Sequence, residues 1–170
     1  MSVPRDPPEP ALRPHVIVAD NCSCPCQDAR FGINGRALAR FFCHCRICQT
    51  LYKAPFADVT AFWGGSVAIA ATDKVRFKRY RLPPALRRGT CVSCGAPVLG
   101  FLTLAPFVRL AFVPTRNLKD ATALPAPATH IFYHRRVADV HDPLPKVSGY
   151  WRSELAVTRL VLRGMARGGA

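Results

Sequence analysis

The chain has 170 residues, of which 49% are hydrophobic, and a formal net charge of +14. A chain of this length buries roughly 70% of its unfolded surface in one domain, so it needs no disulfides to hold a core. It has no run of about 18 apolar residues, so we predict that nothing in it spans a membrane. The charge attracts anions, which include nucleic acid, acidic lipid and small polyanionic substrates. Much of the charge lies in one basic stretch, "DKVRFKRYRLPPALRR". Nucleic acid is the less favoured partner, because base-stacking aromatics are sparse around this stretch and no nucleic-acid-binding motif is present.

The first 14 residues form a Pro-rich segment that we predict to be a disordered tail. This segment has no apolar stretch of the signal-peptide type, so the expected compartment is the reducing cytoplasm. In that compartment, clustered cysteines bind metal more often than they form disulfides.

Short apolar runs broken by turn residues follow from His15 onward, and they predict a mainly β domain of antiparallel sheets over residues 15–150. "HVIVA" is the first expected strand. "ARFGI" and "RALARFF" flank Asn34-Gly35, and "VTAFW" and "SVAIA" flank Gly64-Gly65, so each glycine-containing pair predicts a hairpin turn. The charged "KVRFKRYRL" is typical of an edge strand, and "PVLGFLTL" and "FVRLAFV" complete the pattern.

The last third of the chain has a different composition. Residues 114–149 are Pro-rich and are expected to wrap the sheets as irregular structure. Residues 151–170 form a C-terminal extension that is either a short docking helix or a frayed tail. As a helix it would start at Ser153-Glu154 and present an apolar face, made by Leu155, Val161, Leu162 and Met165.

The eight cysteines fall into three tight groups: Cys22, Cys24 and Cys26; Cys43, Cys45 and Cys48; Cys91 and Cys94. An even number is compatible with disulfides, but such close spacing is typical of metal ligands. "CVSCG" is the most diagnostic motif, because Gly95 lets the chain turn so that Cys91 and Cys94 meet one ion. That ion needs two more ligands, and the pair Cys24 and Cys26 is available for a closed, structural site.

The remaining motif, "CHCRIC", brings Cys43, Cys45 and Cys48 within six positions. Three protein ligands leave an open coordination position, which is the pattern of catalytic zinc. If Cys22 joins them, the site closes and is only structural. The spacing leaves both alternatives open.

Four blocks of the sequence resemble the glutathione-dependent formaldehyde-activating enzyme family, which includes the domain of centromere protein V. They are "CPCQDARFGINGRAL", "FCHCRICQTLYKAPFA", "RRGTCVSCGAPVLGF" and "THIFYHRRVADVHDPLPKVSGY". The resemblance implies a twisted all-β zinc fold shared with methionine sulfoxide reductase B. It also implies two zinc ions per chain and carbon–sulfur lyase activity, in which glutathione adds to formaldehyde to form S-hydroxymethylglutathione, or the reverse.

Matched to the family's motifs, the structural zinc ligands are Cys24, Cys26, Cys91 and Cys94. The second zinc ligands, which also carry the catalytic site, are Cys43, Cys45 and Cys48. The resemblance favours an open second site. Two departures stand out: Gln27 occupies a position where the family usually has glycine, and Leu51-Tyr52-Lys53 replaces a small-residue segment that is expected to border the second zinc.

Other residues receive weaker predictions. His44 should point away from the metal. His130 and His134 are candidate proton donors, with packed or solvated histidines as the alternative that we favour. Arg46, Lys53 and Arg87 are candidate anchors for substrate carboxylates, with solvated cations as the favoured alternative. The aromatic residues Phe56, Phe62 and Trp63 should pack the core or line a cleft. The alternative function is a non-enzymatic, zinc-scaffolded binding domain for nucleic acid or an acidic partner, and Cys22 as a fourth ligand would favour it. The sequence leaves the oligomeric state open.

Overall fold

The computed structural model describes residues 16–81, 86–119 and 124–167. The fold is mainly β, as predicted, with two sheets and a C-terminal helix among these residues. The predicted disordered tail, residues 1–14, lies outside the described part of the chain.

The smaller sheet has the antiparallel order β1-β2-β5, formed by β1 (Val16–Ser23), β2 (Arg30–Arg36) and β5 (Val67–Ile69). The larger sheet has the order β10-β3-β4-β9-β8-β7-β6. Its strands are β3 (Ala39–Cys43), β4 (Ala57–Trp63), β6 (Val75–Arg79), β7 (Arg87–Cys91), β8 (Pro97–Ala105), β9 (Val108–Pro114) and β10 (His130–Ile131). Among the strands that the structure describes, β10 alone pairs in parallel, with β3.

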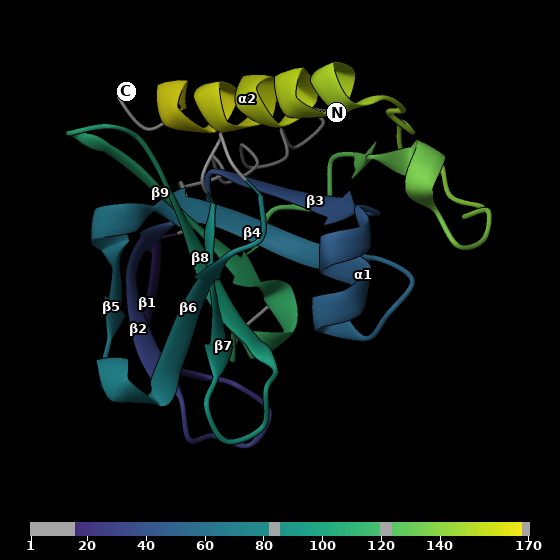
Figure 1. Cartoon of the computed structure of the whole chain (residues 1–170). Helices are drawn as coiled ribbons and strands as arrows, with labels where there is room; N and C mark the ends of the chain where they lie inside the picture. The colour runs from purple at the N-terminus through teal and green to yellow at the C-terminus, as the bar shows by residue number, and fades with distance from the viewer. Residues whose placement is uncertain (1–15, 82–85, 120–123, 168–170) are drawn as a thin grey trace, which may run out of the picture.

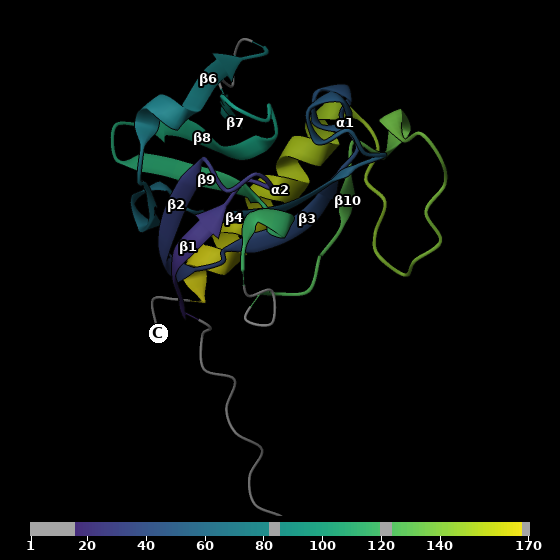
Figure 2. The same ribbon diagram turned by 90° about the horizontal axis from the view of Figure 1, so that it is seen from below.

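The larger sheet is the middle layer of the molecule. The C-terminal helix α2 (Tyr150–Ala166) crosses one face of it, and the smaller sheet packs on the other (Figures 1 and 2). Side chains alternate between the faces of a strand, so Val59 and Ala61 of β4 join the core beneath α2, whereas Phe62 joins the core between the sheets. The fold therefore has two hydrophobic cores that share one sheet.

Both predicted hairpins are wrong. Asn34-Gly35 lies inside β2, where Gly35 pairs with Ile17 of β1. A Cβ atom on Gly35 would lie 2.5 Å from Ser66 Oγ, so close approach of the chains, not a turn, explains this glycine. Gly64 and Gly65 lie in the 3-10 helix η1 (Gly64–Ser66), which carries the chain from β4 in the larger sheet to β5 in the smaller one. At both places the flanking strands belong to different sheets.

The charged segment "KVRFKRYRL" contains β6, which is an edge strand as predicted. Its partner β7, with the sequence RRGTC, was not expected as a strand, because two arginines and a glycine give it no apolar alternation. The described residues of the segment 114–149 are mostly irregular and include β10 and two 3-10 helices, η3 (Thr115–Asn117) and η4 (Tyr133–Arg135). A further 3-10 helix, η2 (Thr72–Lys74), precedes β6.

The C-terminal extension is helical, which confirms that alternative, but the helix starts at Tyr150 and not at Ser153. Ser153 is fully buried, and its hydroxyl donates to the Gly149 carbonyl at 2.7 Å. Of the four residues of the expected apolar face, Val161 and Met165 pack on the sheet, whereas Leu155 and Leu162 are exposed. A Cβ atom on Gly164 would overlap the Leu38 carbonyl, so this glycine lets the helix lie directly on the backbone before β3.

The short helix α1 (Arg46–Tyr52) was not predicted. Cys45 caps it, because its sulfur accepts a hydrogen bond from the Cys48 amide at 3.4 Å. The side-chain amide of Gln49 donates to two carbonyls at 2.8 Å each. One is that of His44, just before the helix, and the other is that of Arg135, beyond β10. A cysteine at the cap gives no ordinary sequence signature of a helix start.

Candidate metal centres and the adjoining cavity

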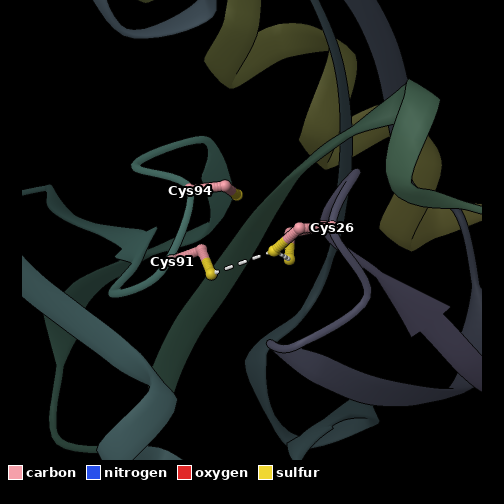
Figure 3. A group of neighbouring side chains, drawn as sticks. Cys26, Cys91 and Cys94 are labelled. Atoms are coloured by element: carbon pink, nitrogen blue, oxygen red, sulfur yellow. Dashed lines mark hydrogen bonds between the residues drawn. The ribbon is translucent and has the colours of Figure 1, made fainter.

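Four thiols converge between the smaller sheet and the β7–β8 connection: Cys24, Cys26, Cys91 and Cys94 (Figure 3). Their sulfur atoms all lie within 4.8 Å of one another. The separations are 3.4 Å for Cys24–Cys26 and 3.7 Å for Cys26–Cys91. Tetrahedral zinc with Zn–S bonds of about 2.3 Å places its sulfur ligands about 3.8 Å apart. The four-thiol group therefore has the dimensions of a closed zinc site.

Two tight turns present these sulfurs. The amide of Gly95 donates to the Cys91 carbonyl at 2.9 Å, and the amide of Gln27 donates to the Cys24 carbonyl at 2.9 Å. Both turns end in the left-handed region, with φ of 69° at Gly95 and 64° at Gln27. Gly95 thus adopts the predicted conformation. Gln27 adopts the same one with a side chain, which explains why glycine suits this position.

Backbone amides also favour the ionised form of one sulfur of the four-thiol group. Burial raises the pKa of the Cys91 thiol, but hydrogen bonds from the amides of Cys94 and Ser93 outweigh this and lower that pKa to about 7. Amides directed at sulfur are what a thiolate ligand needs. The turn is therefore built for a thiolate at Cys91.

Three further thiols meet where β3 ends and α1 begins: Cys43, Cys45 and Cys48, again with their sulfur atoms within 4.8 Å of one another. Cys43 is the last residue of β3, Cys45 caps α1, and Cys48 lies in its first turn. Cys43 and Cys48 are buried and Cys45 is half-buried. One strand end and one helical turn are enough to assemble this three-thiol group.

Charges within the three-thiol group are strongly coupled. Hydrogen bonds from the thiols of Cys43 and Cys48 lower the pKa of Cys45 to about 3. The pKa of Cys43 is raised well above its usual value, first by its hydrogen bond to Cys45. One thiolate thus suppresses ionisation of its neighbours, and three thiolates at this spacing need a cation. Soft thiolate ligands favour zinc among the common divalent ions.

Cys22 lies elsewhere. It is fully buried in the core between the two sheets, with Cys24 and Phe31. Burial raises the pKa of its thiol. It belongs to neither thiol group. Among the described residues, the second group therefore has three thiols and not four, which is the open alternative.

A cavity of about 560 Å³ lies between α2 and the larger sheet, and the three-thiol group forms part of its wall. Most of the lining is apolar and comes from β8, β9 and α2. The described polar residues of the lining, apart from the cysteines and Thr158, are Tyr52, Arg81, Arg88, Tyr150 and Glu154. An open coordination position at the three thiols would therefore face a mostly apolar space.

The same cysteines lie in a segment that the model of a known protein family matches. The model of the glutathione-dependent formaldehyde-activating enzyme family matches residues 19–135, more than half of the chain and all eight cysteines. The chain belongs to this family. The described helices include none long and apolar enough to cross a membrane.

Beyond the family model, a search of curated proteins finds no match. A structural-genomics crystal structure of a Rhodobacter sphaeroides protein is similar at 12% identity and a TM-score of 0.47, over 59% of this chain and 88% of that one. This likeness is too distant to inform fold or activity. The relations to centromere protein V and to methionine sulfoxide reductase B stay predictions.

The three residues considered as anchors for substrate carboxylates lie outside the cavity. Arg46, Lys53 and Arg87 are exposed, and none lines the cavity. Arg81 and Arg88 line it instead. Nothing in the sequence distinguishes them from the other cations of "DKVRFKRYRLPPALRR". The guanidinium of Arg81 contacts Tyr150 in two ways. It donates a hydrogen bond to the Tyr150 hydroxyl, and its Cζ lies 4.3 Å from the centre of the Tyr150 ring.

The segment Leu51-Tyr52-Lys53 was expected to border the second zinc, and Leu51 and Tyr52 do line the cavity beside the three thiols. Burial raises the pKa of the Tyr52 hydroxyl well above its usual value, and negative charge at Cys48 and Cys43 raises it further. Tyr52 therefore stays protonated at neutral pH. It is a protonated hydroxyl in the cavity wall that the sequence analysis did not single out.

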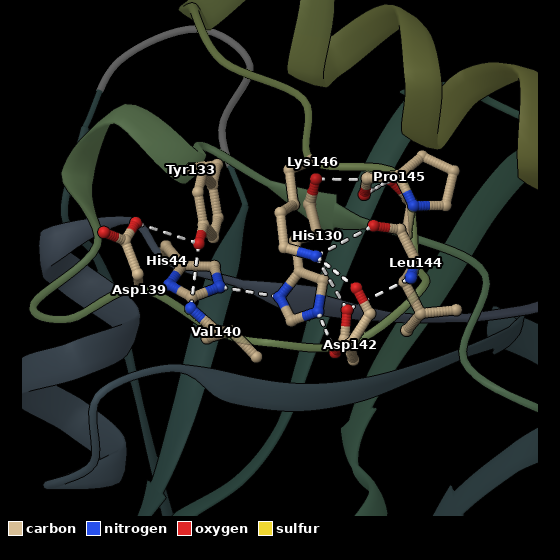
Figure 4. A network of polar contacts seen from close by, with 10 residues as sticks. His44, His130, Tyr133, Asp139, Val140, Asp142, Leu144, Pro145 and Lys146 are labelled. Atoms are coloured by element: carbon tan, nitrogen blue, oxygen red, sulfur yellow. Dashed lines mark hydrogen bonds and ion pairs between the residues drawn. The ribbon is translucent and has the colours of Figure 1, made fainter.

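Two of the histidines, His44 and His130, belong to a separate polar network on the other side of β3 (Figure 4). His44 points away from the thiols, as predicted, and its Nε2 lies 2.8 Å from His130 Nδ1. His130 Nε2 lies 2.8 Å from an Asp142 carboxylate oxygen, and Lys146 donates to the other at 2.9 Å. Burial, then the nearby His130, lower the pKa of His44 to about 4, so its ring is neutral at pH 7.

This network corrects the prediction of histidine proton donors. His130 is fully buried and does not line the cavity. His134 is exposed, outside the cavity, and accepts a hydrogen bond from the Gly149 amide at 2.9 Å. Among the aromatic residues, Phe62 is a core residue and Phe56 packs against Phe42 and His44. Trp63, by contrast, is 38% exposed and lines the cavity.

Proposed function

We propose that this protein is a zinc-dependent carbon–sulfur lyase that adds a thiol, glutathione in the family's reaction, to formaldehyde or a related aldehyde, or reverses that addition. The observation that carries the proposal is the three-thiol group of Cys43, Cys45 and Cys48 in the wall of the cavity, with Cys22 in a different core. Three protein ligands beside a cavity are the arrangement that catalytic zinc sites use.

In this proposal the two thiol groups have separate tasks. The four-thiol group of Cys24, Cys26, Cys91 and Cys94 holds a structural zinc, which leaves no position for a substrate. Cys43, Cys45 and Cys48 would hold a second zinc ion, which would supply positive charge that favours the nucleophilic thiolate form of the substrate thiol. The reducing cytoplasm keeps all seven thiols available as ligands.

The chain's own residues manage the charge that moves during the addition. The substrate sulfur forms a bond to the carbonyl carbon, the C=O double bond becomes single, and its oxygen gains negative charge. Tyr52, protonated and beside the thiols, donates its proton to that oxygen, and the proton lost by the thiol restores the tyrosine. Arg88 lines the same cavity, and its positive charge favours the anionic oxygen.

The alternative, a non-enzymatic zinc-scaffolded binding domain, depended on Cys22 as a fourth ligand in the second site. Its burial in the other core removes the observation that would favour it. The net charge of +14 agrees with either function, because a basic protein also attracts the two carboxylates of glutathione.

Formaldehyde-exchange NMR with glutathione tests the proposal, on the native protein and on Cys48→Ser. We expect the native protein to accelerate exchange and Cys48→Ser to match the uncatalysed rate with an unchanged circular dichroism spectrum. If the native protein also matches the uncatalysed rate, the lyase proposal is wrong. A salt-dependent affinity for nucleic acid would then favour the binding domain.

A further inference from the structure

The size of the cavity exceeds what formaldehyde needs. Formaldehyde contributes one carbon to the adduct, whereas a space of about 560 Å³ lies in the range that holds whole drug-sized ligands. The cavity continues from the three-thiol group along α2 to Leu104 and Leu162, far along β8 and near the end of the helix. A reactant held at the thiols therefore has room for a long substituent.

The chemistry of the lining is also unlike glutathione. Glutathione carries two carboxylates and an ammonium group, and burying any of them without a partner is costly. The described part of the lining offers three charged residues, and two of them face each other: Arg81 lies 3.8 Å from Glu154. Among the described residues of the lining, Arg88 is then the one cation left for two carboxylates.

Apolar side chains make up the rest of the path. Leu102 of β8, Leu110 and Phe112 of β9, and Val157 of α2 line it, and they belong to the core beneath the helix. Hydrocarbon placed against such a surface gains free energy in proportion to the area it buries. The cavity is apolar and large, and it reaches the three thiols. It can therefore hold the hydrocarbon chain of a reactant whose reactive group lies at the cysteines.

We propose that the cavity binds an apolar arm of the thiol–aldehyde adduct, so that the favoured reaction joins a thiol and an aldehyde of which one carries a hydrocarbon chain. This inference rests on the proposed function and narrows its substrates. The chemistry is the same addition: a C–S bond forms, the carbonyl double bond opens, and the thiol proton ends on the new hydroxyl group. The chain lies between α2 and β8–β9, and the hydroxyl lies near Tyr52 and Arg88.

The first test needs no activity. Both tryptophans of the chain, Trp63 and Trp151, line the cavity, so their emission reports its occupancy. We expect 1-octanol, which has neither thiol nor carbonyl, to change this emission saturably. Thr158→Glu places a carboxylate in the lining and should weaken binding at least tenfold, whereas Arg159→Glu places it one residue along, outside the lining, and should leave the dissociation constant within twofold. An absent or non-saturable change, or equal effects of the two variants, would overturn the inference.

The second test is the reaction itself, with glutathione plus formaldehyde, glutathione plus straight-chain aldehydes up to octanal, and octanethiol plus formaldehyde. We expect kcat/KM to rise by up to about three- to fourfold per added methylene until the cavity is filled. The faster of the two long-chain pairs identifies the reactant that carries the arm. A flat dependence on chain length overturns the inference.

The two proposals fail separately. If octanol binds as expected but every pair reacts at its uncatalysed rate, the lyase proposal is wrong and the apolar ligand site stands. If glutathione plus formaldehyde is accelerated while octanol does not bind and longer chains bring no gain, the lyase stands and the apolar arm is wrong.

Discussion

The two thiol groups of this protein differ most in where their members come from. The four-thiol group joins Cys24 and Cys26, beside the smaller sheet, to Cys91 and Cys94 at the end of β7, across 65 residues of sequence for the Cys26–Cys91 pair. The three-thiol group comes from six consecutive residues, between Cys43 and Cys48. A metal in the first ties distant parts of the fold together, whereas a metal in the second closes only a short loop. The first should therefore support folding and the second chemistry.

The largest effect should come from Cys91→Ser. Binding to structural zinc contributes about 10–16 kcal/mol to folding, which exceeds or equals the whole stability of a typical domain. We expect Cys91→Ser to be unfolded or insoluble at 25 °C, and a strong chelator to unfold the native protein. Circular dichroism melting with zinc analysis measures both.

Cys48→Ser is the matched control, because it removes one thiol from the three-thiol group. Its melting temperature should stay within about 5 °C of the native value, since the metal there bridges a single strand end and helix. The comparison breaks down if Cys91→Ser melts like the native protein, or if the two variants are equally destabilised.

Tyr52→Phe sharpens the chemical side of the comparison. It removes the hydroxyl beside the three thiols and keeps the ring. We expect kcat/KM for thiol–aldehyde addition to fall about 100-fold, the usual contribution of a positioned proton donor, with little change in melting temperature. Tyr80→Phe, at an exposed tyrosine outside the cavity lining, should have no effect. A loss of less than threefold for Tyr52→Phe would assign the proton transfer to another group.

A smaller effect should follow from Asp142→Asn, which weakens the network behind β3. The ammonium of Lys146 lowers the pKa of Asp142 to about 2 against the opposing effect of burial, and His130 lowers it further. Since the folded pKa lies below the ordinary value, this carboxylate stabilises the fold above about pH 4 and ceases to do so as the pH falls toward 2.

The native melting temperature should therefore fall between pH 4 and 2, and the fall should be shallower in Asp142→Asn. At pH 7 the variant should melt about 2–4 °C lower. Asp73→Asn, at an exposed aspartate of η2, is the control. Equal pH profiles for native protein and Asp142→Asn would exclude the network as a source of acid sensitivity. Thiol–aldehyde activity at pH 7 should change little, because the network does not line the cavity.

The smallest effect concerns the turns of the four-thiol group. Gln27→Gly relieves the left-handed backbone of a non-glycine residue and should raise the free energy of unfolding by about 1 kcal/mol. Gly95→Ala imposes the same strain on the other turn and should lower it by a similar amount. Denaturant unfolding measures both, and changes of the same sign in the two variants would contradict this account of the turns.

The sequence predicted the thiol groups well because their members are close in the chain or carry a distinctive spacing. "CHCRIC" needs only one turn of helix to bring its sulfurs together, and "CVSCG" encodes its own turn through Gly95. Short apolar runs between turn residues likewise predicted β8 and β9, and the dense positive charge of its segment predicted the edge position of β6.

Features that depend on tertiary placement could not be predicted in this way. Asn34-Gly35 is a strong turn signature, yet it lies inside β2 because the strands on either side pair in different sheets. The cavity combines residues from four separate parts of the chain, so nothing local marks Arg88 as lining it and Arg87 as exposed. Tyr52 gains its high pKa only from burial beside the thiols, and Asp142 becomes a partner of His130 only through an irregular loop.

The helix α2 carries none of the cysteines and begins at Tyr150, beyond the segment that the family model matches. It nonetheless forms one wall of the cavity beside the three-thiol group. One wall of the cavity is thus encoded in a stretch of the gene separate from the one that encodes the thiols. Exchanging this one helix is then a route by which selection, or an engineer, can retarget the chemistry to a different substituent without disturbing a single metal ligand.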